Sequence, residues 1–315
     1  MARIVYLDQN AWIELAKGSW EKERYPKEYE ALAKVVDLVR SGSIVVPLTF
    51  ANIYETLKTN VPGRRVNLAL VQSLISGGWV FRGRRRVFTE TLAAYLATKS
   101  EILRPDLPQS WFLSDVWLEA VADYTPEIYG LEVPARVINS IQRDPGRALF
   151  DCLAFSDDDF RRGVIQRYSA ASADLIARIE YRRARVASEP ISVRKRAYGA
   201  GLIIDEFDFI LSIAQDLGLG WSTVSDIGSS LIRSIAVDVP VLNIERELAV
   251  RLEDQGRAIS ENDLRDMMSF ITVLPFADIV VAEKQFVNLS RQARLDERYD
   301  TRMLTSIFAF LEDEG

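Results

Sequence analysis

The sequence contains no histidine and only one cysteine, Cys152. The absence of histidine excludes Ser-His-Asp triads, Cys-His dyads, histidine general bases and the usual histidine-bearing zinc sites. A single cysteine cannot form an intramolecular disulfide or a thiolate zinc cluster, which fits a reducing cytoplasm. Any catalysis by this chain must therefore use carboxylates, hydroxyls, lysine, arginine or a bound cation.

Long apolar runs and an excess of positive charge are also absent. No stretch of about 18 apolar residues occurs and the N-terminus lacks the apolar core of a signal peptide, so we expect a cytoplasmic protein without a membrane span. The formal net charge of the 315 residues is −6, which gives no overall basic surface for nucleic acid. Local basic patches can still coexist with an acidic metal site.

The two ends of the chain alternate short apolar strands with amphipathic helices. The expected strands cover residues 4–7, 44–46, 79–81, 279–282 and 303–304, and the expected helices cover residues 29–39, 50–57, 66–75, 262–271 and 306–312. This alternation is typical of an α/β fold with a mostly parallel central sheet flanked by helices. Residues 89–257 show mainly helical periodicity. We therefore predict a discontinuous α/β domain over residues 1–88 and 258–315, with a helical insertion over residues 89–257.

Acidic residues stand at the ends of several of these elements. Asp8 ends the first strand, and Asp278 and Glu283 bracket the strand at 279–282, with Glu283 at its carboxyl end. In an open α/β sheet, ligands bind at the carboxyl ends of the strands. Taken alone, each of these acids is equally typical of a turn that ends a strand.

Further acids lie on two of the expected helices. Glu55 is on the helix at 50–57, and Asp263 and Asp266 form an i, i+3 pair on the helix at 262–271. Each taken alone fits the polar face of an amphipathic helix. Converging carboxylates repel one another unless a divalent cation holds them, and hard oxygen ligands select Mg²⁺ or Mn²⁺. Two such ions could support phosphodiester hydrolysis without any histidine.

Four short segments in the same order resemble the motifs of PIN-domain nucleases. Residues 5–13, VYLDQNAWI, resemble the opening strand, aspartate and asparagine of that family. Residues 46–57, VPLTFANIYETL, resemble the second motif, in which a hydroxyl residue precedes a helix that bears a glutamate. Residues 262–286 resemble the third and fourth motifs, with Glu283 where aspartate is usual and either Asp263 or Asp266 as the helical acid.

This resemblance implies a PIN-like fold with a large helical insertion and a metal-dependent endoribonuclease that acts on single-stranded or structured RNA with Mg²⁺ or Mn²⁺. The residues that it implies as metal ligands are Asp8, Glu55, Asp266 and Asp278. Asp263 and Glu283 would be further acids in or beside the coordination shell. Asn10 and Thr49 would orient Asp8, a metal-bound water or the scissile phosphate.

Three local basic runs are candidates for the path of the RNA backbone, because affinity for phosphates rests on lysine and arginine. Solvated helix faces are the other common explanation for such runs. The candidate residues are Arg84, Arg85, Arg86, Arg182, Arg183, Arg194, Lys195 and Arg196.

Other functions are compatible with the same residues. A PIN-like chain without catalysis would be an RNA-binding or scaffold protein, and a DNA nuclease or a phosphatase could use the same acids. The family includes toxins, RNA-processing enzymes and defence effectors. The helical insertion could bind a regulator or a second copy of the chain.

Overall fold

The computed structural model describes residues 2–121 and 133–314, and the chain divides into two compact units. The first unit comprises Met1–Gly83, Phe112–Ala171 and Thr272–Gly315, and the second comprises Arg84–Trp111 and Ser172–Ile271. These boundaries differ from the predicted ones. Residues 112–171 belong to the unit that contains the sheet, whereas residues 84–88 and 258–271 belong to the helical unit.

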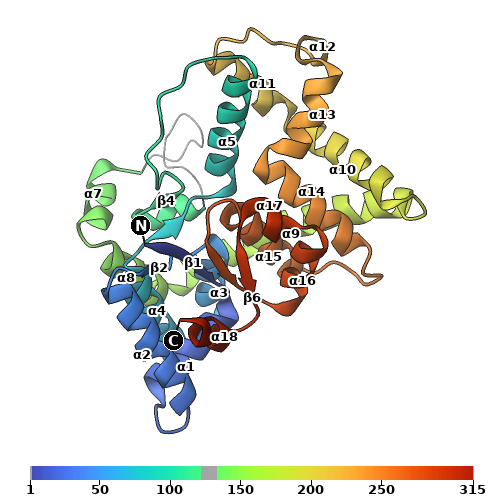
Figure 1. Cartoon of the computed structure of the whole chain (residues 1–315). Helices are drawn as coiled ribbons and strands as arrows, with labels where there is room; N and C mark the ends of the chain where they lie inside the picture. Colours follow the sequence, from blue (N-terminus) through green and yellow to red (C-terminus); the bar gives the residue numbers. More distant parts are fainter. Residues whose placement is uncertain (1, 122–132, 315) are drawn as a thin grey trace. The chain divides into compact units, whose positions relative to one another are not determined.

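The first unit is an α/β structure in which the predicted strands are present. Its strands are β1 (Arg3–Leu7), β2 (Ile44–Val45), β3 (Val80–Phe81), β4 (Leu113–Ser114), β5 (Ile279–Val281) and β6 (Arg302–Leu304). Four of them form one sheet in the order β2-β1-β5-β6 (Figure 1). All neighbouring pairs in this sheet are parallel, as predicted.

The strand that sequence reasoning missed is β4. It pairs in the antiparallel sense with β3 in a separate two-stranded sheet. A parallel bridge between Leu48 and Val80 joins β3 to the segment that follows β2. The two residues of β4 carry too little periodicity to stand out in the sequence, and only their pairing with β3 makes them a strand.

The order of the strands places a topological switch point between β1 and β5. The chain leaves β1 for β2 on one side of the sheet, and it leaves β5 for β6 on the other side. Val5 pairs with Ile279 and Leu7 pairs with Val281, so both strands end at the same level. Ligands of open α/β sheets bind in the crevice beyond the carboxyl ends of two strands arranged in this way.

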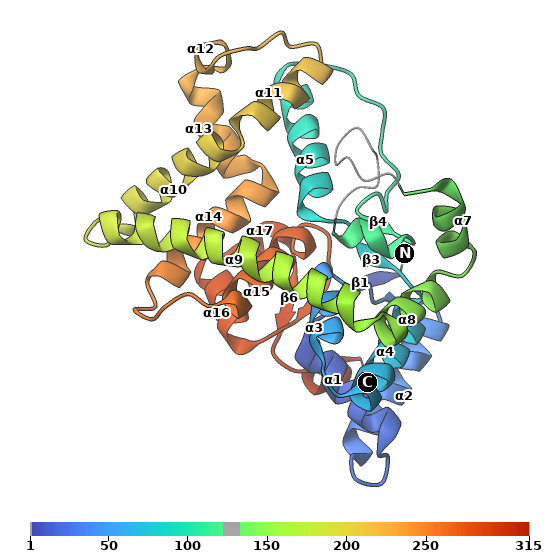
Figure 2. The same ribbon diagram turned by 180° about the vertical axis from the view of Figure 1, so that it is seen from behind.

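Helices flank this sheet. They are α1 (Gln9–Trp20), α2 (Pro26–Arg40), α3 (Phe50–Lys58), α4 (Pro62–Ser76), the 3₁₀ helix η1 (Trp117–Ala120), α7 (Ala135–Arg143), α8 (Pro145–Phe155), α16 (Lys284–Gln292), α17 (Leu295–Tyr299) and α18 (Ile307–Asp313). Helix α4 packs against α1, α3 and α8, and Figure 2 shows α3, α4 and α8 from the side opposite to that of Figure 1. Helices α1 and α2 also approach closely at Gly18. A Cβ atom on Gly18 would lie 2.4 Å from the carbonyl carbon of Glu28, so the close approach requires glycine there.

Alternate residues of β1 face two different apolar environments, as the period of a strand requires. Val5 and Leu7 are fully buried and belong to a core that includes Trp12 of α1. On the opposite face, the rings of Tyr6 and Phe81 meet edge to face with centroids 6.4 Å apart. The central strand is therefore buried on both sides, which fixes the position of the residue that follows it.

The second unit is helical in the part that the structure describes. It contains α5 (Arg84–Lys99), α10 (Ile191–Asp205), α11 (Phe207–Asp216), α12 (Val224–Ile227), α13 (Ser229–Asp238), α14 (Pro240–Glu253) and most of α15 (Glu261–Val273), and α9 (Asp158–Val186) runs into it from the first unit. Over residues 2–121 and 133–314, no helix is long and apolar enough to cross a membrane.

Candidate functional site

Asp8 and Glu283 lie at the switch point of the sheet. The backbone N–H of Asp8 donates to the carbonyl of Val281 at 2.9 Å, which holds the end of β1 against the end of β5. Glu283 follows two residues after Val281. The Asp8 carboxylate caps α1 by accepting a hydrogen bond from the backbone N–H of Ala11 at 3.0 Å. The two predicted acids are therefore neighbours at the carboxyl ends of adjacent parallel strands.

The electrostatic environment of Asp8 shows that a third acid, Glu55, lies near Asp8 and Glu283. Partial burial, together with the negative charges of Glu283 and Glu55, raises the pKa of Asp8 from its usual 3.8 to about 6. Hydrogen bonds from the backbone N–H groups of Ala11 and Glu283 act in the opposite direction. The charges on Glu55 and Glu283 thus lie close enough to oppose ionisation of Asp8, as expected for converging carboxylates.

Asn10 orients one of these acids directly. Its amide nitrogen Nδ2 donates to Oε1 of Glu283 at 2.6 Å, and both side chains are exposed to solvent. Asn10 lies in the first turn of α1, and Glu283 is the residue before α16. The sequence predicts that Asn10 orients Asp8, a metal-bound water or the scissile phosphate, and that role stays a prediction; the contact in this structure is to Glu283.

A layer of buried polar side chains lies behind the site, and sequence reasoning missed it. Gln9 donates to the hydroxyl of Thr56 at 3.1 Å, and that hydroxyl donates to Gln72 at 2.8 Å. Gln72 closes the ring by donating to Gln9 at 3.3 Å. Gln9 follows Asp8, and Thr56 follows Glu55, so the ring fixes the helices that carry these two acids. Their adjacency to predicted site residues was the only available signal.

Thr49 has a structural role, which corrects its predicted one. Thr49 is buried and precedes α3, where its hydroxyl and its backbone N–H both donate to Oδ1 of Asn52, at 3.0 and 2.9 Å. The Thr49 side chain also accepts from the backbone N–H of Asn52, which completes a capping box. The amide of Asn52 in turn donates to the carbonyl of Leu7 at 3.3 Å. Thr49 therefore acts on the site indirectly, by anchoring the start of α3 to the end of β1.

Asp278 lies at the amino end of β5, whereas Asp8 lies at the carboxyl ends of the strands. This position corrects the prediction that Asp278 is a metal ligand together with Asp8. The Asp278 carboxylate accepts a hydrogen bond from the backbone N–H of Ile4 at 2.6 Å, at the amino end of the parallel strands. Ile4 and Asp8 are four residues apart, which corresponds to about 13 Å along a strand. Asp278 therefore closes the opposite edge of the sheet.

Asp263 and Asp266 lie on α15 in the second unit. Asp263 is buried, and its carboxylate pairs with Arg257 at 2.6 Å and accepts from the backbone N–H of Ser260 at 2.8 Å. Burial by itself would raise the pKa of Asp263, but the bonds from Arg257 and Ser260 hold it at about 2. Asp263 is thus a helix cap and an ion-pair partner, and its role in the site stays a prediction. Asp266 is half-buried one turn further on, and its role as a ligand stays a prediction.

The basic residues predicted to contact the RNA backbone mostly form ion pairs inside the second unit, which favours a structural role for them. All of these residues except Arg196 lie within 4 Å of an acid of the same unit. The ion pairs are Arg84 with Glu206 and Glu245, Arg85 with Glu206, Arg86 with Glu90, Arg182 with Asp205, Arg183 with Glu180, Arg194 with Asp254, and Lys195 with Glu247. These basic runs hold helices together, and the helical periodicity of the sequence did not reveal their partners.

The acids at the switch point do not form a finished coordination shell. Among the residues that the structure describes, no group of three or more Asp, Glu or Cys side chains is arranged to hold a metal ion. Asp8 and Glu283 are engaged by backbone and amide donors, and Glu55 acts on Asp8 through its charge. What the site offers is a set of hard oxygen donors beside two parallel strand ends.

The contribution of the buried ring of Gln9, Thr56 and Gln72 to the stability of the fold can be tested by substitution. Replacing Thr56 by valine keeps the side-chain shape but removes the hydroxyl, so Nε2 of Gln9 and Oε1 of Gln72 lose the bonds that they make to it. We expect the free energy of unfolding to fall by about 1–3 kcal/mol. Urea unfolding followed by circular dichroism measures this. In the matched control Thr98→Val, the exposed hydroxyl bonds only to its own helix, so we expect a change below about 0.5 kcal/mol. Equal effects of the two substitutions would refute this role of the ring.

Comparison of the chain with models of protein families, with curated proteins and with solved structures gives no match.

Proposed function

We propose that the chain is a metal-dependent endoribonuclease with a PIN-like fold, whose active site lies at the carboxyl ends of β1 and β5. One observation carries this proposal. Asp8 ends the central strand at the switch point, and the charges of Glu283 and Glu55 oppose its ionisation. Such repulsion is relieved when a divalent cation binds, and oxygen donors of this kind favour Mg²⁺ or Mn²⁺.

The donor set fits such an ion in its chemistry. Asp8, Glu55 and Glu283, all in the first unit, would hold it. When bound, the ion would activate water and stabilise charge on the phosphodiester. Asn10 fixes the carboxylate of Glu283 through the 2.6 Å hydrogen bond, so it acts as a positioning residue.

The ionisation of Asp8 sets the pH range of the proposed activity. Because the pKa of Asp8 is raised to about 6 in the absence of metal, a large fraction of this carboxyl is protonated below that pH. A protonated carboxyl is a poor metal ligand, and a cation must displace the proton in order to bind. The proposed nuclease is therefore expected to bind Mn²⁺ more tightly above pH 6 than below it.

The experiment compares two acids that flank the same strand. Glu283→Gln alters the carboxyl end of β5, whereas Asp278→Asn alters its amino end and keeps an oxygen that can accept from Ile4. With a labelled single-stranded RNA and Mn²⁺, we expect Glu283→Gln to lose most of its cleavage. Asp278→Asn is expected to cleave at the wild-type rate, and EDTA is expected to abolish cleavage by every form.

Three outcomes would contradict the proposal. They are cleavage that persists in EDTA, equal activity of Glu283→Gln and the wild type, and a wild type that binds RNA but never cleaves it. A panel of RNA, single-stranded DNA and a phosphomonoester tests the substrate class, because a preference for DNA or for the phosphomonoester would make the chain a different hydrolase at the same site.

A further inference from the structure

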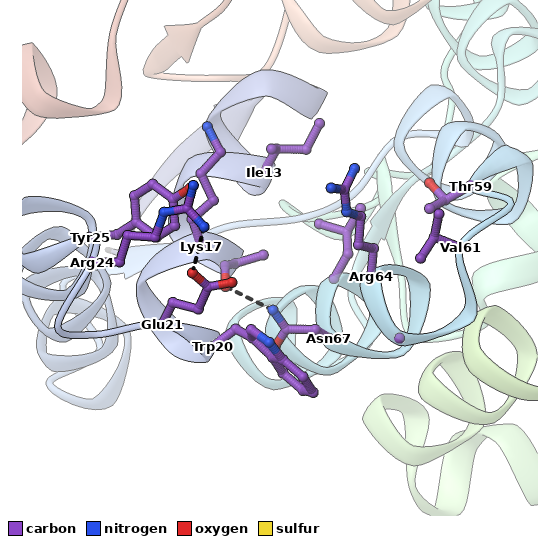
Figure 3. A pocket seen from close by; sticks show the side chains of 13 residues that line it. Ile13, Lys17, Trp20, Glu21, Arg24, Tyr25, Thr59, Val61, Arg64 and Asn67 are labelled. Carbon is purple, nitrogen blue, oxygen red and sulfur yellow. Dashed lines mark hydrogen bonds and ion pairs between the residues drawn. The ribbon is translucent and has the colours of Figure 1, made fainter.

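A pocket of about 630 Å³ opens on the first unit (Figure 3). Its walls are the outer half of α1, the segment that joins α1 to α2, the segment that joins α3 to α4, and the first two turns of α4. The volume lies within the range of about 300–1,000 Å³ that is usual for small-ligand sites. The mixture of side chains in this pocket indicates what kind of ligand it can hold.

Two aromatic side chains line the pocket. Trp20 is the last residue of α1, and 67% of its surface is exposed. The ring of Tyr25 lies 5.9 Å from Nζ of Lys17 and 5.3 Å from the guanidinium carbon of Arg24. An exposed tryptophan at the rim of a pocket offers a flat apolar surface on which a planar ring can stack.

Positive charge accompanies these rings. Lys17 and Arg24 form ion pairs with Glu14 at 2.7 Å and with Glu21 at 3.1 Å, both at the surface. Exposed pairs of this kind are worth little, so their cations can turn toward a bound anion. Arg64 stands in the first turn of α4 and is exposed, and in the described parts of the chain it has no ion-pair partner. The pocket therefore combines a stacking surface with a free guanidinium.

The pocket adjoins the proposed active site along two helices. Its lining residue Ile13 lies three residues after Asn10 on α1, and its lining residue Thr59 lies four residues after Glu55 at the end of α3. At about 1.5 Å of rise per residue, these separations are about 5–6 Å, or one helical turn. Trp20 lies ten residues after Asn10 on the same helix, a rise of about 15 Å, so a chain held with one phosphodiester at the acids would reach Trp20 a few nucleotides further along.

We infer that this pocket binds a nucleotide of single-stranded RNA a few nucleotides away from the scissile bond, with its base stacked on Trp20 and its phosphate on Arg64. The inference rests on the proposed function and names a substrate subsite for it. Stacking on an aromatic side chain needs an unpaired base, which single strands and loops provide and duplexes do not. The adjoining cations suit a ligand that carries phosphate on either side of its base.

The test measures RNA binding without cleavage. A short fluorescein-labelled single-stranded RNA is titrated with the protein in EDTA, and the dissociation constant is read from fluorescence anisotropy over a series of salt concentrations. Trp20→Ala is expected to weaken binding about 5-fold or more, whereas Trp20→Phe keeps a stacking surface and should recover most of the affinity. Arg64→Ala is expected to lower the slope of log K against log salt by about 0.7, the loss of one phosphate contact.

The matched control removes an exposed cation outside the pocket. Arg40 ends α2, is exposed and does not line the pocket, so Arg40→Ala should leave both the affinity and the salt slope unchanged. Wild-type affinity in both Trp20→Ala and Arg64→Ala would overturn the inference, as would equal weakening by Arg40→Ala. RNA binding that depends on the pocket, in a wild type that shows no cleavage with Mn²⁺, would refute the proposed function and leave the subsite standing.

Discussion

Replacing Asp8 by asparagine is expected to abolish metal-dependent cleavage and, at the same time, to make the protein more stable at neutral pH. The loss of cleavage follows from the proposed role of Asp8 as the central ligand at the switch point. The gain in stability follows from the electrostatics of the metal-free site, where partial burial and the charges of Glu283 and Glu55 raise the pKa of Asp8 to about 6. An asparagine carries no charge that these surroundings oppose, and its Oδ1 can still accept from Ala11.

The sign and the size of the stability change follow from the pKa. A carboxyl whose pKa is higher in the folded state binds its proton more tightly there, so the folded protein loses stability as the pH rises through the unfolded and then the folded pKa. A shift from 3.8 to about 6 corresponds to about 3 kcal/mol at pH 7. Asp8→Asn should therefore match the wild type in this respect below about pH 4 and exceed it by up to about 3 kcal/mol above about pH 6.

Unfolding by urea at pH 4, 5, 6 and 7 in EDTA measures this difference, and a parallel series with Mn²⁺ supplies the control. Mn²⁺ should stabilise the wild type at pH 7, since a ligand that binds only the folded state adds to its stability, and it should have little effect on Asp8→Asn. If the variant is less stable than the wild type at pH 7 without metal, the stabilisation that the Asp8 carboxylate gives as the cap of α1 outweighs the cost of its charge. Retained cleavage in the variant would remove Asp8 from the active site.

The local signals of the sequence were sufficient for most of the sheet. Apart from Arg3, the residues of β1 and β5 are apolar or aromatic and largely β-branched, and a turn or a helix start follows each strand, so their periodicity and their limits can be read directly. β4 has two residues and depends on a partner far away in the sequence. The extent of the two compact units also depends on long-range packing, which explains why residues 112–171 pack with the sheet although the sequence groups them with the helical segment.

Those residues of the candidate site that lie at the ends of strands could be predicted from the sequence. Asp8 and Glu283 were found because acids that end parallel strands must meet at one edge of the sheet. Asp278 shows the limit of that reasoning, since it flanks the same strand at the opposite edge. The ring formed by Gln9, Thr56 and Gln72 could not be found, because residues with ordinary surface chemistry become buried there only through the packing of three helices.

Replacing Arg84 by methionine is expected to destabilise the second unit strongly. The affinity of the protein for RNA is expected to stay unchanged. The guanidinium of Arg84 pairs with Glu206 and with Glu245, each at 2.8 Å, and so joins the start of α5 to α14 and to the junction of α10 and α11. Burial acts against the charge of Arg84, but Glu245 and Glu206 overcome it and hold its pKa above the usual range. Methionine would leave Glu245, which is 4% exposed, without this partner.

Breaking a buried pair by removing one partner costs about 3–5 kcal/mol, because the remaining charge stays out of water. The side chain of Arg84 is 21% exposed, so we expect the lower end of that range. Hydrogen–deuterium exchange locates the effect, since the amides of α5 and α14 should exchange faster in the variant than in the wild type.

Arg196→Met is the matched control, because Arg196 belongs to the same predicted basic path but is exposed, with no ion-pair partner in the described residues. Its effect on stability should stay below about 0.5 kcal/mol. The two explanations of the basic runs predict opposite results. If the cation holds helices together, replacing it destabilises the protein and leaves RNA binding unchanged. If the cation contacts phosphate, replacing it lowers the salt dependence of RNA binding and leaves the fold intact. Weakened RNA binding by Arg84→Met with wild-type exchange in α14 would restore the RNA path that the ion pairs now argue against.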